Sequence, residues 1–337
     1  MTPGRQEFRQ NQLTGEWVIC APGRGKRPDD FEEEAGFAEE IPAYDPNCPF
    51  CPGHRDRLPD VLAERQDPGG TWRTRVVPNK FPIITSRSEV DQEQKPLFRR
   101  QPARGAHEVL IESRLHNRSL QDQKVKEVED VLKTYRTRYQ HHRQDPELQA
   151  VVIFKNHGPG AGTSLRHPHS QLMAVNTVPN FIQRRQRIAE TSFQKHQRCL
   201  TCRMIEGEIE AGERVIKNGP DFLTIIPFAA GVPLELWVLP HHHRAHFGDL
   251  KDPEIRSLAR MLRDQLRRLN RLAGYPDYNF VIHSSSLESK RSPARHWLLQ
   301  IVPRTTSRAG FEIGTGMAVN PSLPERSARA LRDTSPD

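Results

Sequence analysis

The chain has 337 residues, of which 35% are hydrophobic and 27% charged. This size indicates one large or two medium domains, and 28 prolines with 21 glycines indicate a polar globular protein with many turns. No stretch resembles a membrane span or a signal peptide, so we expect a cytoplasmic protein without membrane partners. The formal net charge of +8 is spread among acidic residues, which argues against a nucleic-acid partner and equally suits phosphorylated small molecules.

The first motifs along the chain are two C-x-x-C pairs, Cys48/Cys51 in NCPFCPGH and Cys199/Cys202 in RCLTCRM. Five cysteines in a chain without an export signal argue against a disulfide framework. Paired thiolates at this spacing can hold one metal ion, and zinc is the commonest. A thioredoxin-like redox pair would instead begin a helix at the motif, whereas prolines at 49 and 52 make the first pair resemble a loop.

The segments that follow the two pairs repeat one pattern, over residues 105–174 and 231–304. Each has a strand ending near a histidine, a long amphipathic helix, a second apolar strand, a loop and a histidine that opens a third strand. Glu108 precedes His116 by eight residues, as Glu235 precedes His243. The pattern predicts an α+β protein of two pseudo-repeated halves, each an antiparallel sheet with a long crossing helix. We place the halves at 1–180 and 181–320, joined near 180–198, with a short helix and a disordered end in a tail at 321–337.

Aligning HPHSQ with HWLLQ pairs His167 with His296, His169 with Leu298 and Gln171 with Gln300. Each half then offers two cysteines and two histidines, a complete tetrahedral zinc set without a position for water, so both predicted zinc ions are structural. The third ligand of the second set could also be His241 or His242. The predicted ligands are Cys48, Cys51, His116 and His167 in the first half, and Cys199, Cys202, His243 and His296 in the second.

His169 remains as the reactive group, because its counterpart Leu298 cannot attack anything. A neutral imidazole can attack phosphorus and leave again readily. Gln171 could donate a hydrogen bond to a phosphoryl oxygen as charge develops there. The glycine-rich approach NHGPGAGTS at 156–164 offers backbone N–H groups and Ser164 to the same phosphates.

The segment FKNHGPGAGTSLRHPHSQ (154–171) resembles the active-site segment of galactose-1-phosphate uridylyltransferases, the nucleotidyl-transferring branch of the histidine triad superfamily. LTGEWVICAPGRGKRP (13–28), CPFCPG, RVVPNKFP (75–82) and AGFEIGTGM (309–317) are similar to further family motifs in the same order. The resemblance implies a homodimer with active sites near the subunit boundary, His169 as the nucleophile and Gln171 as its phosphate partner. It also implies Arg24, Arg27, Asn79, Asn156 and Ser164 in the nucleotide site, with Phe311 and Glu312 near the hexose phosphate.

The family reaction is a double displacement through a nucleotidyl-histidine. UDP-glucose and galactose 1-phosphate would give UDP-galactose and glucose 1-phosphate. Many family members build a second metal site from a glutamate and an H-x-H set, and this sequence lacks both at the corresponding positions. Its two C-x-x-C pairs are instead similar to a branch of the family that contains ADP-glucose phosphorylases. An adenylyltransferase is therefore the alternative function. A zinc-dependent nucleic-acid-binding protein and a dinucleotide hydrolase of the same superfamily are further alternatives.

Overall fold

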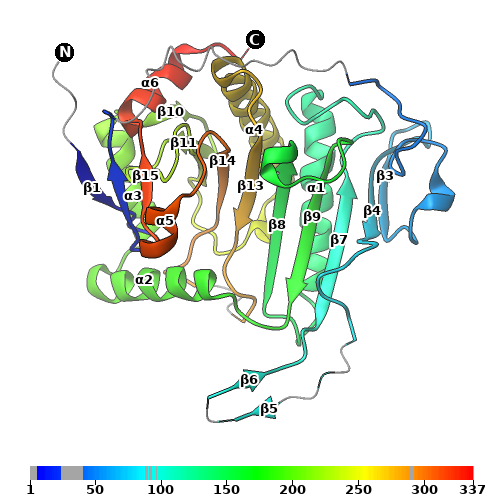
Figure 1. Cartoon of the computed structure of the whole chain (residues 1–337), viewed down its shortest axis with the longest axis horizontal. Coiled ribbons are helices and arrows are strands. Elements are labelled where there is room, and N and C mark those ends of the chain that lie inside the picture. The colour runs from blue at the N-terminus through cyan, green and yellow to red at the C-terminus, as the bar shows by residue number, and fades with distance from the viewer. Residues whose placement is uncertain are drawn as a thin grey trace.

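A ten-stranded antiparallel sheet forms the centre of the computed structural model, in the order β10-β11-β12-β14-β13-β8-β9-β7-β4-β3 (Figure 1). The structure describes residues 6–23, 41–87, 90, 93–95, 97–288 and 292–336. The strands are β3 (Ala63–Gln66), β4 (Trp72–Pro78), β7 (Gly105–Ile111), β8 (Ala150–His157), β9 (His169–Val175), β10 (Val215–Asn218), β11 (Phe222–Ile225), β12 (Leu236–Pro240), β13 (Tyr278–His283) and β14 (Leu298–Pro303).

The sheet contains the predicted repeat. From its two outer edges inward, the strands follow one plan, β3-β4-β7-β9-β8 in the first half and β10-β11-β12-β14-β13 in the second. The halves meet where β8 pairs antiparallel with β13, from His157 opposite Tyr278 to Ile153 opposite Ile282. The predicted α+β class with two repeated halves is therefore confirmed, and the pairing makes one continuous sheet. The division at residue 180 stays a prediction.

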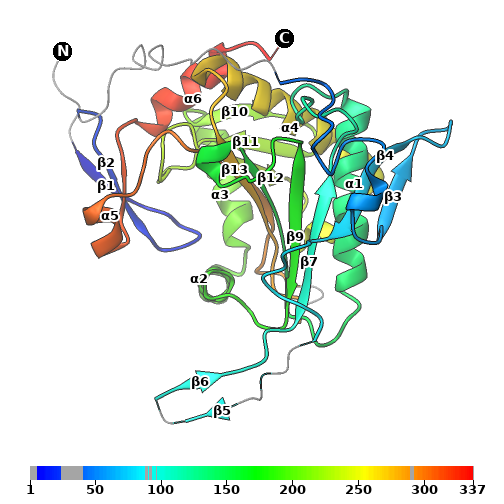
Figure 2. The same ribbon diagram turned by 45° about the vertical axis from the view of Figure 1, so that its right-hand side comes forward.

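Two long helices, α1 (Val125–His142) and α4 (Asp252–Ala273), pack against each other behind the sheet (Figure 2). Both begin in the same way, because the backbone N–H of Lys124 and that of Lys251 donate to the carboxylates of Glu127 and Glu254. Apolar residues of α4 recur every three or four positions and are buried, as expected for a helix with one apolar face. The main hydrophobic core lies between these helices and both halves of the sheet.

The remaining elements lie around this body. The segment predicted to join the halves forms α2 (Asn180–His196), and α3 (Leu200–Ala211) follows it. A small sheet combines both ends of the chain, since β2 (Trp17–Cys20) pairs with β1 (Glu7–Gln10) and with β15 (Ala318–Asn320). The other elements are β5 (Glu93–Gln94) and β6 (Arg99–Arg100), which form a protruding hairpin (Figures 1 and 2), the helix α5 (Gly310–Thr315), and the 3₁₀ turns Arg55–Arg57, Pro159–Ala161 and Phe247–Asp249.

The end of the chain is packed. The predicted short helix at 321–337 is α6 (Pro324–Asp333), and its Ala328 and Leu331 are fully buried in the main core. Arg268 of α4 also donates to the carbonyl oxygens of Leu331 and Arg332. This stretch therefore packs against the body through the apolar face of α6, while the division of the chain that sets 321–337 apart stays a prediction. Within the described ranges, no helix has the length and apolarity needed to cross a membrane.

Candidate functional site

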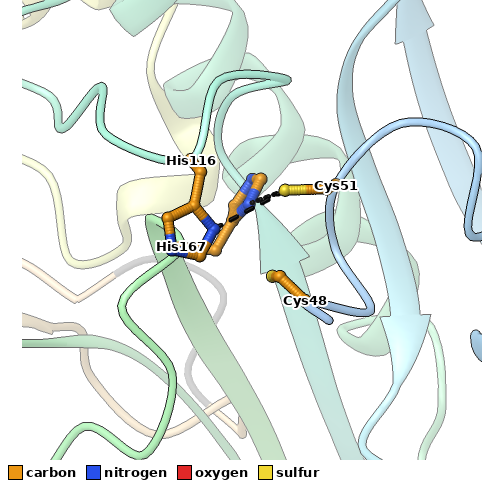
Figure 3. Close-up of side chains that lie close together, drawn as sticks. All are labelled: Cys48, Cys51, His116 and His167. Atoms are coloured by element: carbon orange, nitrogen blue, oxygen red, sulfur yellow. Dashed lines mark hydrogen bonds between the residues drawn. The ribbon is translucent and has the colours of Figure 1, made fainter. Parts of the chain in front are cut away.

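The first predicted metal cluster is assembled from three distant parts of the chain (Figure 3). Cys48 and Cys51 come from the loop after residue 41, His116 follows β7, and His167 precedes β9. All four side chains are buried, and their ligand atoms lie within 4.8 Å of one another. The Cys51 Sγ atom is 3.6 Å from the Nδ1 atoms of both histidines. The prolines predict that this cysteine pair lies in a loop, and it does.

This geometry fits a zinc ion. Tetrahedral zinc, with bonds of about 2.3 Å to sulfur and about 2.0 Å to nitrogen, separates sulfur and nitrogen ligands by about 3.5 Å. His167 also donates from Nε2 to the carbonyl of Ser113 at 2.8 Å, so its Nδ1 lone pair faces the cysteines. Zinc-binding histidines usually make such a second hydrogen bond, which fixes the tautomer and the ring orientation.

The second cluster repeats this arrangement with Cys199, Cys202, His243 and His296. Its sulfur to Nδ1 distances are 3.5–3.8 Å. His243 and His296 donate from Nε2 to the carbonyls of Ser292 and Pro240 at 2.9 and 3.1 Å. Among the three histidines left open, the geometry favours His243, whose ring nitrogen lies with those of the other three residues, whereas His241 bonds Asn218 and Gly219.

A helix does begin at the second pair, as a redox motif would require, since α3 starts at Leu200. The two imidazoles beside the sulfurs favour a metal site nevertheless. A hydrogen bond from Cys202, with others from His243 and His296, holds the pKa of Cys199 well below its ordinary value, which favours the thiolate that binds metal. Cys202 and His243 are more exposed than any ligand of the first cluster.

Strand pairing gives the equivalence of the two halves residue by residue. Gln171 lies opposite Val109 of β7 and Phe154 of β8, whereas Gln300 lies opposite Trp237 of β12 and Val281 of β13. Counting two residues back along β7 and β12 places Glu235 at the position of His107. The suggested match of Glu108 with Glu235 is thus wrong by one residue. Glu108 instead faces α1, where Arg138 and His142 bind its carboxylate.

The predicted nucleophile, His169, is the first residue of β9 and is buried at the end of the sheet. Its Nδ1 lies 2.9 Å from the carbonyl oxygen of His167. A carbonyl can only accept, so Nδ1 carries the proton and the Nε2 lone pair is free to react. Burial lowers the pKa of His169, which keeps the ring neutral. A neighbouring metal ligand and a free imidazole nitrogen therefore share one tripeptide.

A cavity of about 690 Å³ opens beside this ring. It is lined by His169 and by two residues predicted for the nucleotide site, Asn156 and Ser164. The glycine-rich loop does not offer its backbone as expected. The N–H of Gly160 donates to Asp277 at 2.5 Å, and the next three N–H groups bond carbonyl oxygens at 158 and 159, so these four donors already have partners.

Gln171 lies two residues further along the same face of β9. Its side-chain oxygen is 2.7 Å from Nε2 of His107, and the side-chain nitrogen of Asn79 lies 3.1 Å from the same Nε2. The structure thus brings the predicted residues Gln171 and Asn79 together through a histidine that was not predicted. Strand alternation could have identified His107, because it lies two residues before Val109 and so shares a face of β7 with the residue opposite Gln171.

Two pairs of predicted residues are not part of this arrangement. Arg24 and Arg27 lie outside the described residues. Phe311 and Glu312 are in α5, and Glu312 lines a different cavity, of about 760 Å³, together with Gln300 and His283 of the second half. Within one chain the structure does not bring this segment to His169.

Comparison with known proteins agrees with this geometry. Residues 3–179 match the family model described as galactose-1-phosphate uridyl transferase, N-terminal domain. The chain is also 34% identical to an ADP-glucose phosphorylase of Arabidopsis thaliana, over 98% of this chain and 93% of the relative. The chain belongs to the galactose-1-phosphate uridyl transferase family.

Two further similarities bear on this family assignment. A galactose-1-phosphate uridylyltransferase of Thermotoga maritima is 26% identical over 97% of this chain and 98% of its own length. A solved structure of an Arabidopsis thaliana ADP-glucose phosphorylase with bound ADP-glucose superposes with a TM-score of 0.83 at 31% identity, covering 98% of this chain and 99% of that one. The chain is thus a nucleotidyltransferase of this family.

Proposed function

We propose that the protein is an ADP-glucose phosphorylase that works through an adenylyl-histidine at His169. The observation that carries the proposal is the free Nε2 of a buried, neutral ring at the edge of a cavity that Asn156 and Ser164 also line. ADP-glucose is favoured as donor by the 34% identity to the Arabidopsis phosphorylase, compared with 26% to the Thermotoga uridylyltransferase. From the motifs alone UDP-glucose is the first candidate donor and ADP-glucose the alternative, and this proposal reverses that ranking.

The reaction proceeds in two displacements. Nε2 of His169 attacks the α-phosphorus of ADP-glucose, and the bond from that phosphorus to the glucose 1-phosphate oxygen breaks. An oxygen of inorganic phosphate then attacks the adenylyl-histidine, which releases His169 and forms ADP. Gln171 donates its amide N–H to a non-bridging oxygen as charge develops in each step.

The two Cys/His clusters would hold one zinc ion each, and four protein ligands leave no open position on the metal. Zinc in such a site supplies cross-linking and no substrate activation. The first site would fix His167, and with it the carbonyl that orients the His169 ring. We also propose that the protein is a cytoplasmic homodimer, in which Phe311 and Glu312 of a second copy approach the sugar phosphate, and that Arg24 and Arg27 contact the pyrophosphate.

The proposal is tested by incubating the purified protein with ADP-glucose or UDP-glucose, each labelled with ³²P at the α-phosphate. Rapid labelling from ADP-glucose, and release of labelled ADP on adding phosphate, is the expected result. His169→Ala should take up no label while keeping both metals, and His141→Ala, at an exposed histidine, should behave as the unchanged protein. A labelled His169→Ala protein would show that the nucleophile is another residue.

A uridylyltransferase is the second candidate, supported by the family model over residues 3–179. In that case UDP-glucose would label the protein rapidly, and galactose 1-phosphate would remove the label as UDP-galactose. The ratio of the two labelling rates therefore decides between the candidates in one experiment.

A further inference from the structure

The strand that carries His169 separates from its neighbour at the catalytic end. Strands β8 and β9 pair from Ala150 opposite Val175 to Phe154 opposite Gln171, and the pairing ends there, two residues before His169. In the second half, β13 and β14 stay paired two residues further, to His283 opposite Leu298. The cavity beside His169 opens where the first pair of strands is no longer bonded, since Asn156 and His157 of β8 line it.

A buried side chain makes the missing connection. Lys155 Nζ donates to the carbonyl oxygen of His169 at 3.0 Å and to the Glu112 carboxylate at 2.6 Å. The two charged side chains are 1% and 0% exposed. The hydroxyl of Tyr135 of α1 lies 3.2 Å from the Glu112 carboxylate and 2.6 Å from the hydroxyl of Ser170, the residue after the nucleophile, so it bonds both. Lys155 of β8 thus holds the main chain of His169, and Tyr135 of α1 holds the side chain of Ser170.

The second half is an internal comparison for this network. By the strand equivalence given above, Ile282 stands at the position of Lys155, Pro240 at that of Glu112, and Leu299 at that of Ser170. The half in which Leu298 stands at the position of the nucleophile therefore has side chains without polar atoms at all three positions, although it has the same strand order and a Cys/His cluster of its own. Buried ion pairs often stabilise a protein no better than apolar side chains of similar size.

We propose that Lys155 and Glu112 form a positioning pair, which holds the backbone of His169 on the side where pairing with β8 is missing, while Ile111 of β7 pairs with it on the other side, so that the substrate cavity can open beside the ring. The inference rests on the proposed role of His169 as nucleophile. The pair touches no substrate and acts only through the main chain at 169. Its function would be to fix the distance between Nε2 and the α-phosphorus, because small misplacements of reacting atoms are costly in rate.

The test is the double variant Lys155→Met/Glu112→Leu, since either single change would leave an unpaired charge in the interior and prevent folding. The matched control is Glu108→Leu/Arg138→Met/His142→Leu, which removes another buried charged cluster between β7 and α1, including the histidine that also bonds Glu108, without touching His169. Labelling by ADP-glucose is measured in a single turnover, and ADP-glucose affinity in a His169→Ala background. We expect the first variant to label about 100-fold more slowly with affinity unchanged, and the control to keep both.

A second measurement does not depend on turnover. The ¹⁵N spectrum of the His169 ring reports whether Nδ1 carries the proton, as the bond to the His167 carbonyl requires. We expect this single tautomer in the unchanged protein and in the control, and a mixture in the Lys155→Met/Glu112→Leu protein. A folded double variant with the original labelling rate, or with the original ring spectrum, would overturn the inference. Absence of labelling in the unchanged protein would instead contradict the proposed function, and the ring spectrum would still decide the positioning.

Discussion

His107 donates a 2.7 Å hydrogen bond from Nε2 to the side-chain oxygen of Gln171. Its Nδ1 accepts the backbone N–H of Ile83 at 3.2 Å, so the proton must be on Nε2. The amide oxygen of Gln171 is thereby occupied, and its NH₂ group remains for a phosphoryl oxygen. Gln300 differs, because its NH₂ group already donates to Glu235 at 2.7 Å.

This relationship predicts graded losses of activity. Gln171→Ala should slow labelling by about 100-fold, as the loss of an oxyanion donor does. His107→Phe should slow it by about 10-fold, because only the orientation of the amide is lost. Gln300→Ala is the matched control in the second half and should change the single-turnover rate less than about twofold. An equal loss in Gln300→Ala would show that these amides act through stability.

The two metal clusters should differ in how readily they lose metal. Cys202 and His243 are partly exposed, whereas all four ligands of the first cluster are buried. A chelator such as EDTA should therefore remove one metal equivalent well before the other. Cys199→Ser should abolish the fast phase and leave one metal, measured by elemental analysis. Loss of both metals in one phase would contradict the difference.

Removing the first metal should be costly for folding. Cys48→Ser should leave one metal equivalent and lower the melting temperature by more than about 5 °C, since binding free energy at a structural site is also folding free energy. Cys20→Ser is the control, because Cys20 is buried but lies outside both clusters. Thermal unfolding followed by circular dichroism measures both variants.

The low pKa of His157, a half-buried side chain that also lines the cavity beside His169, predicts a loss of stability in mild acid. Burial lowers the pKa of His157 to about 3, whereas an unfolded histidine titrates near 6.5. Its contribution to stability is complete above pH 6.5 and is lost as the pH falls toward 3, because the unfolded chain binds a proton that the folded chain refuses. His157→Asn should reduce the pH slope of the unfolding free energy in this window by on the order of 1 kcal/mol per pH unit. Parallel slopes for the two proteins, from urea unfolding, would contradict this assignment.

The glycine-rich loop offers a matched pair of substitutions. Gly158 has a φ of +82°, and a Cβ there would come within 1.6 Å of the Asp277 carboxylate that holds Gly160. Gly162 has a φ of +86°, but a Cβ there would meet nothing within 4 Å. Gly162→Ala should cost about 1 kcal/mol from backbone strain alone, and Gly158→Ala clearly more, with slower labelling. Equal losses in denaturant unfolding would show that the contact with Asp277 is unimportant.

The repeat and the two metal clusters could be predicted because their signals are local and occur twice. Spacing alone predicts most of the ligands, from the C-x-x-C pairs, from a histidine after each first strand, and from the matching segments HPHSQ and HWLLQ. Only the choice of the third ligand in the second half required the structure, because His241 and His243 are both imidazoles and differ only in where their side chains point.

The supporting residues could not be predicted because they depend on cross-strand register. An offset of one residue between the halves aligned Glu108 with Glu235, and a one-residue shift moves a side chain to the other face of a sheet. Lys155 and Glu112 are 43 residues apart, and although Lys155 lies within the segment 154–171, nothing in that motif points to Glu112 as its partner. The loop at 156–164 misled for a related reason, since the N–H of Gly160 is taken by Asp277 from the other half and the next three N–H groups bond carbonyl oxygens within the loop.

The junction of β8 with β13 also bears on how such a molecule came about. If the chain were divided between the halves, each half would expose an unpaired inner strand along its full length. The same strand of an identical half could pair with that exposed edge. A duplicated ancestor that self-associated edge to edge would yield this architecture once its two copies were fused. After fusion one reactive centre suffices, which frees the other to diverge while its Cys/His cluster remains beside the shared sheet.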